Sequence, residues 1–292
     1  MPRIRPRLVR VQPEVAIELL NSTLYGQPAH SKDGVGTSFA APKVSHVAAH
    51  LQNIFPAASP LLYRTLIVQS ARWPGWAESE SDKDKVLRLI GYGLPSLERA
   101  TQNSENRVTL ITPDAEIISS KQLHLYTVRI PDELRNPALE ARIRIDVTLA
   151  YTALPRRTRA RRTGYLETWL DWESSKLSEP REEFLARMQN GGTSAYAEFP
   201  WTLHKRKGLG EVEETSRNRG TVQKDWAVFD SFDLPEEFAI AVRSHIGWNH
   251  LEGAGSARYC LAASFEVMQG EVPIYNLIQS EVQLEAEAEI TV

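Results

Sequence analysis

The spacing of apolar residues changes near residue 105, and this change constrains the fold of the 292-residue chain more than any other feature. Before it, apolar residues recur three or four positions apart, which is typical of helices with one buried face. After it, short runs of alternating apolar residues are separated by polar loops, which is typical of strands. We therefore predict two domains, over residues 1–105 and residues 106–292.

The clearest helical pattern of the first domain begins at Thr37. Its apolar face consists of Val44, Val47, Ala48, Leu51, Ile54 and Phe55. We place Pro42 in the first turn of this helix, where a missing N–H costs little, and Pro56 directly after its end. A second helix is predicted over Pro60–Ala71. The segment Asn21–Gly36, which precedes the first of these helices, is rich in Asn, Ser, Gly and Pro, and this composition predicts a loop.

The second domain carries seven candidate strands. They are Arg107–Ile111, Leu123–Arg129, Ile143–Tyr151, Leu166–Trp172, Ala227–Phe232, Phe238–Ser244 and Arg258–Val267. Alternation is clearest at Ile143, Ile145 and Val147, and the Glu-rich end is either an edge strand or a frayed tail. Short strands between polar loops favour an all-β sandwich or a jelly roll.

The heptapeptide Gly36–Pro42, with the sequence GTSFAAP, is the segment that carries chemistry. Gly36 permits a tight turn because it has no Cβ. Ser38 then falls at the N-terminus of the predicted helix, where unpaired N–H groups and the helix dipole favour an anion. A serine in this position can act as a nucleophile, while its own N–H helps to hold the oxyanion that follows attack.

This heptapeptide resembles the active-site serine signature of the subtilases, Gly-Thr-Ser-x-Ala-x-Pro, with no departure at a signature position. Pro13-Glu14-Val15 resembles the Pro-Asp-Val segment that the family places before its serine. Gly91-Tyr92-Gly93 resembles the turn before the family's closing helix, so three matches occur in the expected order. The resemblance implies α/β architecture for the first domain, with the C-terminal portion of a parallel sheet between helices.

The resemblance also implies a serine-type endopeptidase that hydrolyses peptide bonds through an acyl-enzyme on Ser38. Gly36, Thr37 and Ser38 would form the active-site turn, with the Ser38 N–H as an oxyanion donor. The implied partner is a peptide or protein substrate, and no cofactor or metal is implied. The family's aspartate and histidine precede its serine, in Asp-Thr-Gly-like and His-Gly-Thr-His-like motifs that do not occur in this sequence. Whether the chain is an enzyme by itself is therefore left open.

Nearby histidines do not replace the absent one. His46 lies eight residues beyond Ser38 on the predicted helix. At 1.5 Å per residue it is about 12 Å away, whereas a nucleophile–base hydrogen bond needs about 3 Å. His50 is farther along, and His30, beside Asp33 in the preceding loop, has no upstream residue resembling an orienting aspartate.

Because an unaided hydroxyl is a weak nucleophile, we expect the isolated chain to be inactive. The Asp/His half would come from a separate chain, or the sequence is a truncated product. The alternative from another class is a non-catalytic protease remnant, or a β-sandwich module that binds a partner. The genomic neighbourhood would distinguish the protease from the non-catalytic alternative. An adjoining open reading frame that encodes the Asp and His motifs would favour the protease.

The remaining features favour ordinary structural roles. A dense basic run consists of Arg156, Arg157, Arg159, Arg161 and Arg162. We interpret it as a solvated loop, because no interleaved aromatic residues support stacking on nucleic-acid bases. Cys260 is the single cysteine, which excludes an internal disulfide and favours a cytoplasmic location. The net charge of −3 and the absence of a long apolar run predict no membrane partner.

Overall fold

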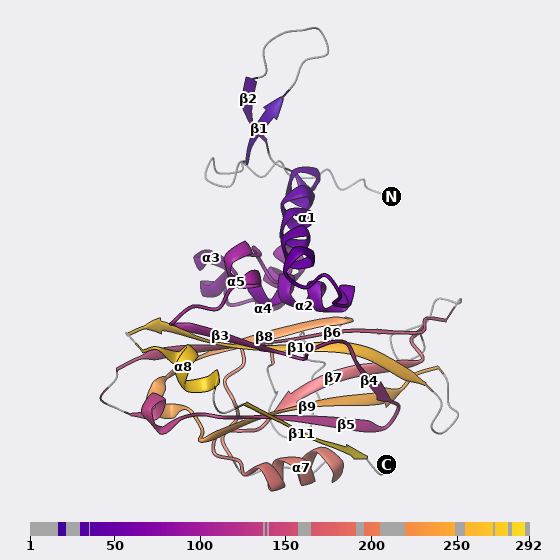
Figure 1. The fold of residues 1–292 in the computed structure, drawn as a ribbon, viewed down its shortest axis with the longest axis vertical. Helices are drawn as coiled ribbons and strands as arrows, with labels where there is room; N and C mark the ends of the chain where they lie inside the picture. Colours follow the sequence, from indigo (N-terminus) through magenta and orange to yellow (C-terminus); the bar gives the residue numbers. More distant parts are fainter. Residues whose placement is uncertain are drawn as a thin grey trace.

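The computed structural model describes residues 17–21, 30–34, 36–136, 138, 140–156, 165–190, 196–204, 220–248, 255–270, 272–279 and 282–289. For residues 17–21, 30–34, 279 and 282–289 the description covers the backbone alone. Helices come first along the chain and are followed by two antiparallel sheets, so the fold is mixed in helix and strand content (Figure 1). No helix in these ranges is long and apolar enough to cross a membrane.

A small hairpin precedes the helices. Strand β1 (Ile17–Asn21) pairs antiparallel with β2 (His30–Gly34), with Ile17 opposite Gly34 and Asn21 opposite His30. The loop predicted over Asn21–Gly36 is therefore wrong for residues 30–34. Strand β2 reads HSKDG and contains no apolar residue, so its pairing is set by its partner strand and leaves no periodic signal in the sequence.

Five helices follow the hairpin. They are α1 (Thr37–Ile54), α2 (Pro60–Ser70), α3 (Gly75–Ser79), α4 (Lys83–Ile90) and α5 (Leu97–Thr101). The predicted helices over the α1 and α2 segments are confirmed. Helix α2 begins at Pro60 because the Ser59 side chain accepts a hydrogen bond from the Leu61 N–H, and proline fits the first helical position.

Helix α1 extends away from the two sheets (Figure 1), and its buried side chains lie in its C-terminal half. Val47 and Leu51 are buried, whereas Val44 and Ile54 of the same apolar face are 37% and 47% exposed. All residues from 36 to 46 are exposed. The inward-facing stripe predicted from the sequence is therefore only partly covered.

The strands of the second part form two sheets. The first contains β3 (Arg107–Ile111), β4 (Glu116–Ser119), β6 (Arg142–Ala153), β8 (Val222–Asp230) and β10 (Ser256–Gln269), in the order β3-β10-β6-β8 with β4 also on β10. The second contains β5 (Gln122–Arg129), β7 (Thr168–Ser174), β9 (Glu237–Ile246) and β11 (Val282–Glu289), in the order β11-β5-β9-β7.

All seven predicted strands are present with somewhat different ends, and the Glu-rich end is an edge strand, β11. Every strand pairing in the described ranges is antiparallel. The parallel sheet that we expected in residues 1–105 thus has no counterpart among the described residues. A parallel pair needs a long crossover between its strands, and the two described strands of this part are joined as a hairpin instead.

The main hydrophobic core lies between the two sheets, which form two layers in Figure 1. The predicted alternation on β6 is confirmed, because Ile143, Ile145 and Val147 are each 0% exposed and belong to this core. Leu170 and Trp172 of β7 contribute from the opposite layer. Alternate positions of β6 therefore face the other sheet, as the period of a strand requires.

Helices cover the outer faces of both sheets. Helix α2 contacts β6 and β10 of the first sheet, while α7 (Arg181–Asn190) places Phe184 on apolar residues of β5 and β9. A last short helix, α8 (Ile274–Gln279), contacts β3 and β10. The element type changes between α5 and β3, near the predicted boundary at residue 105. The two predicted domains nevertheless share a buried interface through α2, and the boundary itself stays a prediction.

Candidate active site at the N-terminus of helix α1

Ser38 is the second residue of α1, directly after the N-cap Gly36 and the first helical residue Thr37. The predicted position of this serine at a helix start is confirmed, and the segment is exposed. The ability of Ser38 to act as a nucleophile depends on the groups around its hydroxyl.

The backbone at this helix end leaves donors free. Phe39 and Ala40 donate their N–H groups to the carbonyl oxygen of Gly36, at 3.0 and 3.2 Å. Within the described residues, no group accepts a hydrogen bond from the N–H of Thr37 or Ser38. The first turn carries no acidic side chain. The positive end of the helix dipole is therefore available to an anion, such as a developing oxyanion beside Ser38.

Two expectations about this segment are wrong in detail. Gly36 has φ 161° and ψ 155°, an extended conformation rather than a tight turn. A Cβ at Gly36 would meet the Phe39 ring at 3.6 Å, an ordinary contact distance, so this backbone does not require glycine. Pro42 lies in the second turn, inside the helix, not in the first. Because proline has no N–H, the Ser38 carbonyl lacks its usual partner four residues on.

The described side chains supply no base for Ser38. His46 and His50 are exposed on the same helix, eight and twelve residues away, which places them about 12 and 18 Å along its axis. His30 and Asp33 belong to β2, whose side chains lie outside the described part. A serine–histidine–aspartate geometry is therefore not assembled by the residues that the structure describes.

Two further segments carried the resemblance to the subtilases. Pro13–Val15 lies outside the described residues, whereas the structure explains the glycines of the Gly91–Gly93 turn. Gly93 has φ 94°, and a Cβ there would overlap the carbonyl oxygen of Arg72. Arg72 and Leu94 exchange backbone hydrogen bonds of 3.0 and 2.9 Å across this contact. The turn therefore joins the end of α4 to the segment after α2, and glycine is required at position 93.

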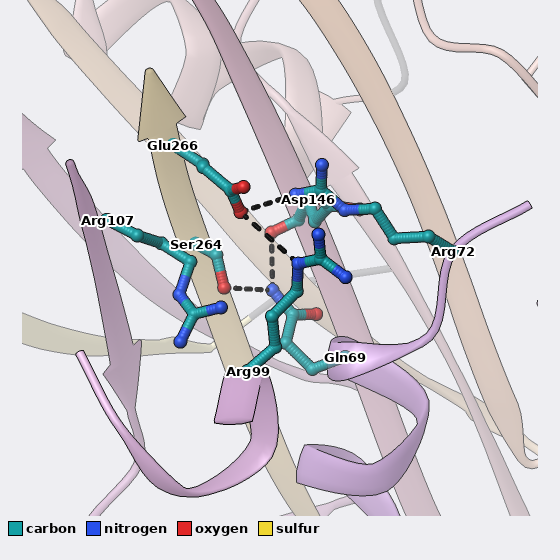
Figure 2. Close-up of a pocket in the computed structure, with 7 residues that line it drawn as sticks. All are labelled: Gln69, Arg72, Arg99, Arg107, Asp146, Ser264 and Glu266. Carbon is teal, nitrogen blue, oxygen red and sulfur yellow. Dashed lines mark hydrogen bonds and ion pairs between the residues drawn. The ribbon is translucent and has the colours of Figure 1, made fainter. Parts of the chain in front are cut away.

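A buried charged cluster, which the sequence analysis missed, joins α2 to the first sheet (Figure 2). At its centre Asp146 accepts hydrogen bonds from Nε and a terminal nitrogen of Arg144, at 3.0 and 3.1 Å. Lys224 Nζ lies 3.3 Å and Arg72 3.4 Å from the same carboxylate. Burial by itself would raise the pKa of Asp146, but the charges of Lys224, Arg144 and Arg72 outweigh it and hold the pKa well below its ordinary value.

Lys224 connects this cluster to the C-terminal end of α2. Its ammonium is fully buried and donates to the carbonyls of Val68, Gln69 and Ala71, at 3.1, 2.8 and 2.6 Å. These carbonyls lie where a helix end leaves acceptors unpaired, and a cation is favourable there. Burial lowers the pKa of Lys224 to about 8, although Asp146 acts in the opposite direction.

A small cavity lies beside the cluster and is lined by Gln69, Arg72, Arg99, Arg107, Asp146, Ser264 and Glu266 (Figure 2). It has room for about one water molecule. Glu266 accepts from Arg72 at 2.6 Å, and the Gln69 amide donates to the Asp146 carbonyl and to the Ser264 hydroxyl, at 2.9 and 2.7 Å. The lining groups are largely paired with one another, and these contacts connect the helices to the sheet. The cavity is too small to accommodate a peptide.

The other sequence-based interpretations have mixed outcomes. Cys260 is buried, and the pair Glu182-Glu183 lies exposed in the first turn of α7. Arg156 lies 5.9 Å from the ring centroid of Trp248, so an aromatic residue does accompany the start of the basic run. The other four arginines of that run lie outside the described residues.

Trp172 and Trp226 are buried. Trp169 is half-buried and stacks on His245 with ring centroids 3.8 Å apart. His245 lies 3.0 Å from a carboxylate oxygen of Asp171. Among the described residues, no group of three His, Cys, Asp or Glu side chains could hold a metal ion.

Comparison with known proteins supports the resemblance of the segment around Ser38 to the subtilases. The model of the subtilase family matches residues 13–93, which include Gly36–Pro42 and Gly91–Gly93. The uncharacterized protein y4bN of Sinorhizobium fredii (strain NBRC 101917 / NGR234) is 28% identical over 258 residues, covering 86% of this chain and 56% of that protein. The chain thus spans about half the length of the curated relative that it matches. The part of the chain that carries Ser38 is a subtilase-like region.

Proposed function

We propose that this chain is the serine-bearing part of a subtilisin-like serine endopeptidase. The observation that carries the proposal is the position of Ser38 at the open, exposed N-terminus of α1, within the segment that matches the subtilase family. In the complete site, a base removes the hydroxyl proton and the serine oxygen attacks the peptide carbonyl. The Ser38 N–H stabilises the resulting oxyanion. Collapse of the intermediate breaks the peptide C–N bond, the protonated base gives its proton to the departing amine, and water then hydrolyses the acyl-enzyme left on Ser38.

The aspartate and histidine of the site would come from a further polypeptide segment, either on a separate chain or in a longer protein. The exposure of α1 supports this proposal. Phe39 is 39% and Val44 37% exposed on a helix whose C-terminal half is already docked through Leu51. A segment packed around the N-terminal half would remove these side chains from water and complete the site. The match to only 56% of the relative is consistent with such a segment.

The two antiparallel layers would form a β-sandwich domain over residues 106–292 that supports the serine-bearing helices. Three observations favour this role. Helix α2 lies directly on the first sheet, Lys224 holds the C-terminal end of α2, and Val47 and Leu51 of α1 share a hydrophobic cluster with Cys260 of β10. The proposed partner remains a peptide or protein substrate, and we propose a cytoplasmic location.

A fluorophosphonate probe, which labels activated serines, tests this function. We expect no labelling of the chain alone, because a lone serine hydroxyl has no base. Co-expression with the polypeptide from the adjoining reading frame should produce stoichiometric labelling at Ser38. Ser38→Ala should abolish it, whereas Ser45→Ala, an exposed serine two turns along the same helix, should not.

The outcomes separate the two function classes. Labelling of Ser38 in the isolated chain would show that the chain holds its own base, against the proposal that another segment supplies it. An absence of labelling and of peptide hydrolysis in both preparations would favour the non-catalytic, partner-binding alternative. Labelling that survives Ser38→Ala would place the nucleophile elsewhere.

A further inference from the structure

We propose that His46 and His50 form an exchangeable site for a divalent transition-metal ion on the exposed side of α1. The two histidines are four residues apart on a regular helix, so their side chains lie one above the other on the same face. Their ring centroids are 4.5 Å apart with an angle of 77° between the ring planes. Both residues are exposed, so an ion can reach them from solvent.

This separation is close to that of two imidazoles on one metal ion. With metal–nitrogen distances of about 2.1 Å and a roughly tetrahedral angle at the metal, the ring centroids would be about 5 Å apart. To bind one ion, the two rings would have to turn so that a nitrogen of each points at a common position. The same spacing on a helix provides the two histidine ligands of the H-E-x-x-H zinc motif. Here Val47 follows His46, so the glutamate that acts as a base in that motif is absent.

The ligand chemistry selects the class of ion. Imidazole nitrogens suit Cu²⁺, Ni²⁺ and Zn²⁺, whereas Mg²⁺ and Ca²⁺ prefer oxygen ligands. Affinity should be highest for Cu²⁺, which follows the general order for divalent first-row metals. The described residues offer no third histidine, cysteine or carboxylate at this place. Water therefore completes the coordination, and the ion exchanges with solvent. The sequence analysis expected no metal site, and the present proposal departs from that expectation.

Binding has a structural consequence because the exposed half of α1 has little packing to hold it. An ion that joins His46 to His50 links two successive turns, and it binds only while the helix is formed. It should therefore stabilise the helix by mass action. Lys43 lies three residues before His46 and is also exposed. A carboxylate at position 43 would add a third ligand in the Glu-x-x-His spacing found in helical metal sites.

Isothermal titration of the untagged chain with CuCl₂, NiCl₂ and ZnCl₂ at pH 7.5 tests the site. We expect one saturable high-affinity site, tightest for Cu²⁺, and slower amide exchange in α1 when the ion is bound. His50→Gln should weaken Cu²⁺ binding at least about tenfold, because a chelate becomes a single ligand. Lys43→Glu should strengthen binding.

The matched control combines His50→Gln with Gln52→His, which keeps the composition but breaks the four-residue spacing. Both positions are exposed, so the helix should remain intact by circular dichroism. This double variant should bind Cu²⁺ as weakly as His50→Gln. Wild-type affinity in the double variant, or no saturable Cu²⁺ binding by the wild-type chain, would overturn the proposal. These results do not depend on hydrolysis, so they are distinguishable from a failure of the proposed protease function.

Discussion

Lys224 should make the stability of this protein rise between pH 7 and pH 9. Its side chain is fully buried, and burial lowers its pKa from 10.5 to about 8. Between these two values the unfolded chain still holds the proton that the folded chain has released. Stability rises with pH wherever the unfolded state binds more protons. Deprotonation of Lys224 therefore favours the folded state across this window.

The magnitude follows from the pKa difference. One pKa unit corresponds to about 1.4 kcal/mol, and the part of the titration between pH 7 and pH 9 gives a rise on the order of 1 kcal/mol. Cys260 acts in the opposite direction, because burial raises the pKa of its thiol from 9.0 to about 11. The unfolded thiol therefore loses its proton first, and stability falls as the pH passes 9. Within the chosen window this loss of stability is smaller than the gain from Lys224, because most of the thiol's titration in the unfolded chain lies at higher pH.

Urea unfolding of the wild type and of Lys224→Met at pH 7, 8 and 9 isolates the effect. At pH 7 the variant should be about 3–5 kcal/mol less stable than the wild type. It leaves the carbonyls of Gln69 and Ala71 unpaired, and it removes the positive charge that Lys224 places beside the Asp146 carboxylate. The difference in stability between the two proteins should widen by about 1 kcal/mol from pH 7 to pH 9, because the Cys260 contribution is the same in both and cancels. A difference that stays constant or narrows would refute the assigned sign for Lys224.

Two further pairs of substitutions, each a test variant with its control, examine other parts of the fold by the same unfolding measurement. Gly93→Ala should cost at least about 2 kcal/mol, because φ is 94° and the new Cβ would overlap the Arg72 carbonyl; Gly75→Ala, where nothing lies within 4 Å, should change stability by less than about 1 kcal/mol. Leu51→Ala should cost about 2–5 kcal/mol as a buried core truncation. Ile54→Ala, at 47% exposed, should cost less than about 1 kcal/mol, and equal losses at both positions would contradict the docking of α1 described above.

Local patterns predicted the elements that depend on local physics. The three- and four-residue spacing through Val47 and Leu51 predicts α1, and the alternation through Ile143 and Ile145 predicts β6. Ser38 is the second residue of the helix whose apolar-periodic face begins at Val44. These predictions succeed because a helix or a strand with one buried face must repeat that face at its own period.

Tertiary structure decided which faces found a partner. The apolar stripe of α1 looks uniform in sequence, yet Leu51 is docked while Val44 remains exposed. The carboxylate of Asp146, buried on β6 beside Arg144, acquires its structural role only because Lys224 and α2 meet it from distant parts of the chain. Spacing along the sequence records the period of each element. Such long-range charge pairing leaves no periodic trace, because it depends on which elements the fold brings together.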